Sequence, residues 1–308
     1  MFGNIENSLW VEAYRPDTLD GYVGNEHIVD KVKIYLQNGD VPHLLFYGTA
    51  GTGKTTLAKI IANGVDADVM YINASDENNV DTVREKIKSF ASTIGFRRWK
   101  ICILDEADYL TPNAQAALRN LMETFSKTTR FILTCNYVEK IIEPIQSRCQ
   151  TFAIIPPSKS EVAKRVAKVL SDEDIAFDKA DLVAIVNNNY PDIRRILNTC
   201  QGQVVDGKLK LDQHSLMQSN YMTEILKELQ TKNAKSAFVN CRQILADSKV
   251  KDYTSMYRFL FDHLDEYAST NKAMVILVLA EAQYQDSFVV DKEIHAMATI
   301  IKILNNIA

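Results

Sequence analysis

The feature that most constrains this chain is a glycine-rich segment lying between an apolar run and a helical pattern. Residues 43–47 (HLLFY) predict a short buried strand that breaks at Gly48, and an amphipathic pattern from Lys54 to about Asn63 predicts a helix. The segment between them reads Gly48-Thr49-Ala50-Gly51-Thr52-Gly53-Lys54-Thr55 and matches the phosphate-loop pattern G-x-x-x-x-G-K-[ST]. A strand, such a loop and a helix, in that order, are typical of open α/β domains that bind nucleoside triphosphates.

The residue types in this loop suit a triphosphate. Glycines let backbone N–H groups turn inward around the phosphates, and the helix N-terminus adds a favourable dipole. Lys54 would place its charge beside the γ-phosphate, and the hydroxyl of Thr55 would be a ligand of Mg²⁺. We therefore expect ATP to be bound by Gly51, Thr52, Gly53, Lys54, Thr55 and Thr56.

Two acids follow the apolar run Ile101-Cys102-Ile103-Leu104. They lie where a buried strand ends, and ligands of open α/β sheets gather at the carboxyl ends of strands. We expect Asp105 to hold Mg²⁺, directly or through water, and Glu106 to act as the general base on the attacking water. Two solvated acids at a strand end are the alternative.

The first half of the chain alternates strand and helix patterns. Further strands are predicted at 68–72, 100–104, 130–135 and 151–155, and further helices at 80–94 and 111–125, the latter opening with Thr111 as cap and Pro112 at its first position. Near-continuous apolar strands suit a parallel sheet covered on both faces. The prediction is a doubly wound α/β domain of the P-loop NTPase type.

Helical patterns replace strands after Pro156-Pro157. Ser158 and Glu161 predict a capping box for a helix to about Leu170, with helices at 179–188 and 191–199 and a turn or short hairpin in 201–212. From Met222 onward four or five helices are expected, one of them the apolar stretch 273–282. The predicted domains are an ATPase domain at 1–156, a helical lid at 157–218 and an all-α domain at 219–308.

Composition limits the location and the partners. The 308 residues include no run long enough for a membrane span, and the N-terminus has neither a signal nor a transit pattern, so a cytoplasmic protein is expected. The five cysteines form no C-x-x-C pair, which favours reduced thiols over a zinc site. The net charge of −4 means that any nucleic-acid contact must come from a local basic surface or from helix N-termini.

Five motifs, in a fixed order, carry a resemblance to a known family. They are the phosphate loop, Asp105-Glu106-Ala107-Asp108, Thr134-Cys135-Asn136, Ser147-Arg148-Cys149 and Pro191-Asp192-Ile193-Arg194. Together they resemble the AAA+ sliding-clamp loaders, most closely the replication factor C small subunits and the large subunit of T-even-type phage loaders. The similarity runs from about Trp10 to Asn198, and its most specific parts are the Ser-Arg-Cys string and the segment Ala74-Ser75-Asp76…Val83-Arg84. One departure is Pro191, where the family more usually has glycine.

The resemblance implies roles for three polar residues. Asn136 would be sensor 1, beside the γ-phosphate or the attacking water, and Arg194 would be sensor 2 on the lid. Arg148 would be the arginine finger that enters a neighbouring subunit's site. Taken alone, each has an ordinary alternative: a turn-forming asparagine, a solvated helix face and a surface ion pair.

The resemblance also assigns the base pocket. The segment from Trp10 to Pro16 is similar to the part of the family that wraps the adenine, which implies base contacts by Val11, Glu12, Ala13, Tyr14 and Val23. An N-terminal arm that merely packs on the core is the alternative.

Contacts with DNA and with the clamp are expected on and just after the helix predicted at 80–94 and at the start of the helix predicted at 111–125. Sequence-independent contact with the DNA backbone is predicted for Arg84, Lys88, Thr111 and Asn113. Clamp contact is predicted for Ile87, Phe90, Ile94 and Phe96, since Ile87-Lys88-Ser89-Phe90 is similar to the I-x-x-F core of clamp-binding peptides. A helix that packs on its own sheet is the alternative, and it predicts that no apolar side chain near Phe96 is exposed.

The implied function is that of an ATPase subunit which opens a sliding clamp and loads it onto primer–template DNA, with hydrolysis releasing the closed ring. A pentamer with several copies of this chain is implied, held by the C-terminal helices as a collar, and in the host cytoplasm if a phage encodes it. The main alternative is an AAA+ motor such as a Holliday-junction branch-migration helicase, which would need a C-terminal winged-helix domain. A helicase of the Asp-Glu-Ala-Asp type would need a second recombinase-like domain, and an assembly factor without activity would not need an intact Lys54, Asp105 and Glu106.

Overall fold

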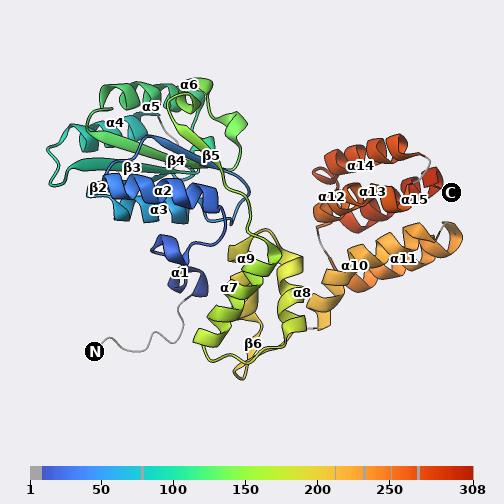
Figure 1. Ribbon diagram of the computed structural model, residues 1–308. Coiled ribbons are helices and arrows are strands. Elements are labelled where there is room, and N and C mark those ends of the chain that lie inside the picture. Colours follow the sequence, from blue (N-terminus) through green and yellow to red (C-terminus); the bar gives the residue numbers. More distant parts are fainter. Residues whose placement is uncertain are drawn as a thin grey trace. The chain divides into compact units, whose positions relative to one another are not determined.

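The computed structural model describes residues 9–77, 80–211, 213–231, 234–250, 252–268 and 271–307. The chain divides into two compact units, Met1–Leu209 and Lys210–Ala308. In Figure 1 the first unit runs from blue to yellow and the second from orange to red. In the described part of the chain, no helix combines the length and the apolar character needed to cross a membrane.

A five-stranded parallel sheet forms the centre of the first unit. Its strands are β1 (Leu44–Tyr47), β2 (Ala67–Asn73), β3 (Trp99–Asp105), β4 (Thr129–Cys135) and β5 (Gln150–Ala153), in the order β2-β3-β4-β1-β5. The predicted parallel α/β fold is therefore confirmed. Because all strands are parallel, their carboxyl ends lie at one edge of the sheet, where the phosphate loop follows β1.

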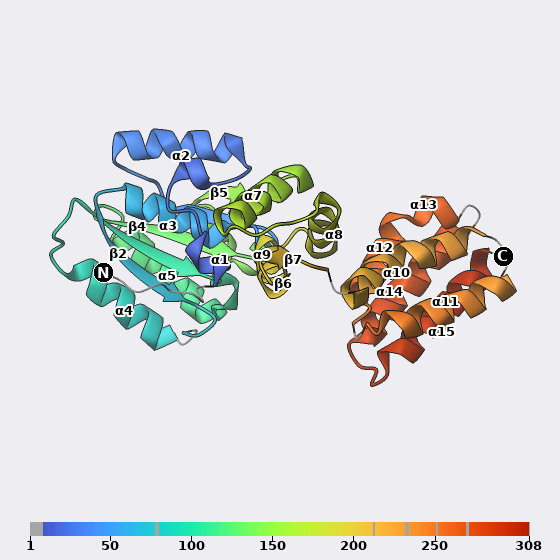
Figure 2. The same cartoon turned by 90° about the horizontal axis from the view of Figure 1, so that it is seen from below.

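Helices cover both faces of this sheet (Figure 1 and Figure 2). The helices α2 (Glu26–Asn38) and α3 (Lys54–Gly64) lie on one face, and α4 (Val80–Ser92) and α5 (Pro112–Thr124) lie on the other. Alternate residues of β3 enter the two cores: Ile101 and Ile103 pack with α2 and α3, whereas Cys102 and Leu104 pack with α4 and α5. The predicted Thr111 cap of α5 is present, since its hydroxyl accepts from the backbone N–H of Ala114.

The rest of the first unit is mainly helical. It contains α1 (Trp10–Ala13), α6 (Glu143–Gln146), α7 (Lys159–Asp172), α8 (Lys179–Asn189), α9 (Ile193–Gly202) and the hairpin β6 (Val204–Val205) and β7 (Lys208–Leu209). The predicted capping box of Ser158 and Glu161 and the predicted hairpin are confirmed. Helix α9 begins two residues later than predicted, because the side chain of Asp192 caps it by accepting from the backbone N–H of Arg195 at 3.0 Å.

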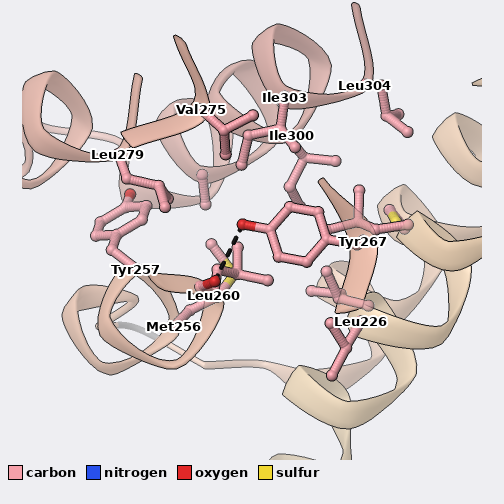
Figure 3. Packing of buried hydrophobic residues seen from close by; sticks show 14 of the residues in the cluster. Leu226, Met256, Tyr257, Leu260, Tyr267, Val275, Leu279, Ile300, Ile303 and Leu304 are labelled. Atoms are coloured by element: carbon pink, nitrogen blue, oxygen red, sulfur yellow. Dashed lines mark hydrogen bonds between the residues drawn. The ribbon is translucent and has the colours of Figure 1, made fainter. Parts of the chain in front are cut away.

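In its described residues the second unit consists of helices only. They are α10 (Gln213–Gln230), α11 (Ala234–Ser248), α12 (Thr254–Asp262), α13 (Leu264–Tyr267), α14 (Lys272–Asp286) and α15 (Lys292–Ile307). The prediction that helices begin at Met222 is wrong, since α10 begins at Gln213. Figure 3 shows the core, where the Tyr267 hydroxyl donates to the Leu260 carbonyl at 3.0 Å among aliphatic side chains. The boundaries at 156/157 and 218/219 stay predictions.

Candidate active site

A pocket at the carboxyl edge of the sheet gathers residues that are far apart in the sequence. Its wall includes the phosphate-loop residues 50–56, the pair Asp105 and Glu106 after β3, and residues 134–136 at the end of β4. The remaining wall comes from the N-terminal segment and from helices α7 and α9 of the same unit. The structure thus brings together the predicted phosphate-binding, acidic and sensor residues.

The phosphate loop has a backbone that only glycine adopts readily. Gly51 and Gly53 have φ of 73° and 97°, in the left-handed region. A Cβ atom on Gly51 would lie 1.9 Å from Oδ1 of Asp192, and one on Gly53 would lie 3.1 Å from the ring of Tyr22. The loop is therefore a tight cradle ahead of α3, which is the form that a phosphate group requires.

Lys54, the first residue of α3, lies at the centre of this cradle. Its Nζ atom donates to the carbonyl oxygens of Gly48 and Thr49 and to Oδ1 of Asn136, each at 2.8 Å. Burial lowers the pKa of Lys54, while the neighbouring Asp105 and Asp108 oppose that shift. An anionic phosphate is a stronger acceptor than these neutral oxygens, so the ammonium group is well suited to bind one.

The carboxylate of Asp105 accepts hydrogen bonds from three hydroxyl groups. Its Oδ1 atom accepts from Thr55 at 2.7 Å and from Thr134, and its Oδ2 atom accepts from Tyr71 at 2.6 Å. Thr55 and Asp105 thus offer adjacent hard oxygen ligands of the kind that Mg²⁺ prefers. The described residues hold no cluster of three or more acidic, histidine or cysteine side chains that could hold a metal ion.

Glu106 follows with an uncommon backbone. Its φ is 54°, a left-handed value that costs energy for a residue with a side chain, and its N–H group donates to the hydroxyl of Thr134 at 3.2 Å. Its side chain lines the pocket beside the phosphate loop. An acid in the wall of this pocket, directly after Asp105, fits the general-base role expected for Glu106.

The loop after β4 is held by a residue that the sequence analysis does not single out by role. Oδ2 of Asp108 accepts from the backbone N–H groups of Asn136 and Tyr137, at 3.2 and 3.3 Å. Asp108 is buried, so this contact fixes the backbone of Asn136 while its amide oxygen meets Lys54. Nothing in the local sequence signals the contact, because it joins segments after two different strands.

Three of the five residues expected to contact the base lie in the wall of the pocket. Val11, Tyr14 and Val23 line the pocket, but Glu12 and Ala13 are exposed and are not among the described residues that line it. Because α1 turns those two side chains outward, Glu12 instead pairs with Arg15 at 2.6 Å. Further lining residues that the sequence analysis missed are Arg15, Tyr22, Val162 and Arg165.

Helix α9 places Arg194 in the pocket wall. The backbone N–H of the preceding Ile193 donates to the carbonyl oxygen of Gly51 at 3.2 Å, so the start of α9 touches the phosphate loop directly. On α7, Arg165 donates to the carbonyl oxygen of Tyr14 at 2.8 Å. Arg165 and Arg194 therefore both line the pocket, whereas the motif at 191–194 predicts only Arg194.

Arg148 is not among the described residues that line the pocket of its own chain. Its guanidinium group pairs with the carboxylate of Glu123 on α5 and donates to the carbonyl oxygen of Pro144 at 2.7 Å. The side chain remains about one third exposed. This position is compatible with an ion pair within the chain and with a finger offered to a neighbour.

The residues predicted to contact DNA are on the surface. Arg84 and Lys88 are exposed on α4, and Thr111 and Asn113 are exposed at the start of α5. The Thr111 hydroxyl is engaged as the helix cap, at 3.3 Å from the N–H of Ala114. None of the four side chains is buried, and only Thr111 has a structural role, as the cap of α5.

The predicted clamp-binding residues divide into two groups. Ile87 is fully buried in the core between α4 and the sheet, so its assignment to a partner surface is corrected to a core role. Phe90 is half-buried, with the ammonium group of Lys100 5.3 Å from its ring centre. Ile94 is 97% exposed and Phe96 is fully exposed, which is the outcome that packing on the chain's own sheet does not predict.

Comparisons with known proteins agree with this geometry. Residues 44–157 match the family described as "ATPase family associated with various cellular activities (AAA)". The replication factor C small subunit of Archaeoglobus fulgidus is 41% identical over 78% of this chain and 78% of its own length, and that of Haloarcula marismortui is 45% identical over 65% and 63%. The Thermotoga maritima RuvB Holliday junction branch migration motor aligns over 92% of this chain and 91% of its own, with a TM-score of 0.57 and 15% identity.

The fold and the site define a P-loop ATPase of the AAA+ class. At 15% identity the likeness to RuvB shows the shared fold alone. The sequence identity to the archaeal proteins is more specific, and the chain belongs to the family of replication factor C small subunits. The resemblance drawn from the five motifs is thereby confirmed.

Proposed function

We propose that this chain is the ATPase subunit of a sliding-clamp loader, which opens the clamp, places it on primer–template DNA and releases it when ATP is hydrolysed. Membership of the replication factor C small-subunit family supports the proposal. The observation that carries it is the meeting of Lys54, Asn136, Thr55 and Asp105 in one hydrogen-bonded site. An assembly factor without activity would not need that constellation.

The residues of the site have separable tasks. The loop N–H groups and Lys54 bind the triphosphate, and Thr55 and Asp105 hold Mg²⁺. When bound, Mg²⁺ neutralises charge on the phosphate oxygens. Glu106 accepts the proton of the attacking water, and Asn136 orients that water or the γ-phosphate.

Contact between α9 and the phosphate loop supports a sensing role for the helical segment. Arg194 faces the pocket, and the N–H of Ile193 already bonds to Gly51. A γ-phosphate that attracts the Arg194 guanidinium would favour one position of α9 over another. Binding and hydrolysis of ATP would in this way move the helical segment.

Hydrolysis is proposed to need a neighbouring subunit. Arg148 is absent from the described wall of its own pocket and is held near the surface by Glu123, so it is available to a second copy of the chain. The helices of the second unit would form the collar, and α14 exposes Leu277, Tyr284 and the adjoining Phe288. A pentamer with several copies of this chain and a different partner subunit is the proposed assembly.

The clamp surface is proposed to be the loop after α4. Two charged side chains hold it: Lys100 donates to the carbonyl oxygen of Phe90 at 2.5 Å and to Thr93, and Asp68 accepts from the N–H of Phe96 at 2.8 Å. Exposed Ile94 and Phe96 are therefore presented on a fixed backbone. The cations Arg84 and Lys88 and the start of α5 would face the DNA phosphates.

Steady-state ATP turnover tests the function directly. The purified chain would be assayed alone, with primed DNA, and with DNA, a sliding clamp and the partner subunit from the same source. Strong stimulation by DNA and clamp together is expected. Stimulation by DNA alone, with branch migration, would favour the motor instead, although the described residues of the second unit show no strand for a winged helix.

A mixing experiment tests the finger. Arg148→Ala and Glu106→Gln subunits, each inactive in a homogeneous assembly, are expected to regain part of the turnover when combined, since a Glu106-intact site can then receive an intact finger. Glu123→Gln is the matched control: it removes the charge that holds Arg148 and keeps the finger. Arg148→Ala assemblies that hydrolyse ATP normally would refute the trans arrangement.

A further inference from the structure

Tyr71 reaches the active site from a strand that carries none of the motifs. It lies in β2, the edge strand of the sheet, where Asn73 is paired in register with Asp105 and Tyr71 with Ile103. Its hydroxyl donates to Oδ2 of Asp105 at 2.6 Å. The side chain thus extends along the strands to the carboxylate expected to hold Mg²⁺.

The three hydroxyl donors divide the two oxygens of this carboxylate. Thr55 and Thr134 donate to Oδ1, and Tyr71 alone among the described residues donates to Oδ2. A carboxylate rotates easily about its last bond unless both oxygens are held. The Tyr71 hydrogen bond therefore fixes the plane of the Asp105 carboxylate, with one of its oxygens turned toward Thr55, the other expected metal ligand.

The ring of Tyr71 is held from a second direction. The ammonium group of Lys59 lies 5.1 Å from the ring centre, and Lys59 is one helical turn after Thr55 on α3. Tyr71 consequently contacts the helix that carries one metal ligand and the carboxylate that supplies the other. The phenolic hydroxyl of a tyrosine is protonated at neutral pH, so it can donate to the Asp105 carboxylate.

We propose that Tyr71 is a positioning residue of the magnesium site, which orients the Asp105 carboxylate for the Mg²⁺ of Mg²⁺·ATP through its hydroxyl group. The residue would not touch the metal or the nucleotide. This inference rests on the proposed magnesium-dependent ATPase function. It adds a requirement that neither the phosphate loop nor the acidic motif contains.

Tyr71→Phe is the test, because it removes one oxygen and keeps the ring beside Lys59. ATP binding would be titrated calorimetrically at a series of free Mg²⁺ concentrations and in EDTA. The expected result is a rise of about tenfold in the half-saturating Mg²⁺ concentration, the size usual for partners of metal ligands, with unchanged affinity for ATP in EDTA. Thr134→Val is expected to shift the Mg²⁺ dependence in the same direction, and the exposed Tyr109→Phe is the silent control.

The outcomes separate the two claims. If ATP binding by the wild type depends on Mg²⁺ and Tyr71→Phe has the same half-saturating Mg²⁺ concentration, the role of Tyr71 is overturned and the proposed function is left intact. An equal loss of ATP affinity with and without Mg²⁺ would also overturn it, since damage to the pocket rather than to the metal site would then be responsible. A wild-type protein whose binding and turnover ignore Mg²⁺ would overturn the proposed function itself.

Discussion

Replacing Gln115 by methionine should destabilise the first unit strongly, although the residue touches no expected ligand. Gln115 lies on α5 with 2% of its surface exposed. Its amide nitrogen donates to the carbonyl oxygens of Leu110 and Lys140, at 3.1 and 2.9 Å, and its oxygen accepts from the N–H of Ile142 at 2.8 Å. One side chain thereby joins the segment after β3 to the segment that leads from β4 toward Arg148.

The magnitude follows from those three bonds. Methionine has nearly the same length and shape but no partner for the two carbonyl groups and the N–H group. The fully buried carbonyl of Leu110 costs about 1–3 kcal/mol when it loses its partner, and the partly buried carbonyl of Lys140 and N–H of Ile142 cost less because water can reach them. Part of this sum is offset because an amide no longer has to be desolvated. We expect the free energy of unfolding to fall by about 3 kcal/mol.

Tryptophan fluorescence during urea unfolding is a suitable assay. Both tryptophans, Trp10 and Trp99, belong to the first unit, so the signal reports on that unit. Gln37→Met on the exposed side of α2 is the matched control and should change stability by less than about 0.5 kcal/mol. A Gln115→Met protein as stable as that control would refute the reasoning.

Three further predictions use other parts of the first unit. Burial, with a smaller contribution from the Arg130 charge, lowers the pKa of His43 to about 4. Between about pH 6.5 and pH 4 the unfolded chain therefore binds a proton at this residue that the folded chain does not. The free energy of unfolding should consequently fall as the pH is lowered from 6.5 toward 4. The urea midpoint should fall more between pH 7 and pH 5 for the wild type than for His43→Asn, because asparagine keeps a hydrogen-bond acceptor but does not titrate. Lys100→Met should reduce clamp-stimulated turnover and leave basal turnover unchanged, because only the loop that presents Phe96 loses its support. Gly51→Ala would bring a Cβ atom to 1.9 Å from Asp192 at a φ of 73°, and calorimetry should show ATP affinity reduced about tenfold or more.

Local signals made most of the fold predictable. The strands depend on runs of buried apolar residues, and the caps Thr111 and Ser158 depend on contacts within three residues, so both can be recognised from short windows. Helix α2 carries the same kind of signal, since Ile28, Val32 and Leu36 recur at helical spacing and the first two are fully buried.

The site was predictable where a motif is continuous and not where contacts cross strands. Lys54, Thr55, Asp105 and Asn136 belong to motifs with their own chemistry, and they meet in the structure. Tyr71 reaches Asp105 only because of the parallel register of β2 and β3, which no local pattern specifies. The outward turn of Glu12 and Ala13 likewise depends on how α1 packs on α9, a contact between distant segments.

Helix α4 shows why apolarity alone does not identify a partner surface. Ile87 and Phe96 are both large and apolar, yet Ile87 completes the core while Phe96 is fully exposed. Isolated exposed apolar residues are common and need no explanation. Here, however, a buried lysine and a strand aspartate hold the loop, and a Cβ atom on Gly95 would lie 2.9 Å from the Asp68 carboxylate. These contacts hold the backbone of a loop whose Ile94 and Phe96 side chains are exposed, which is why this loop, and not Ile87, is the part of the proposed clamp surface that the structure leaves accessible.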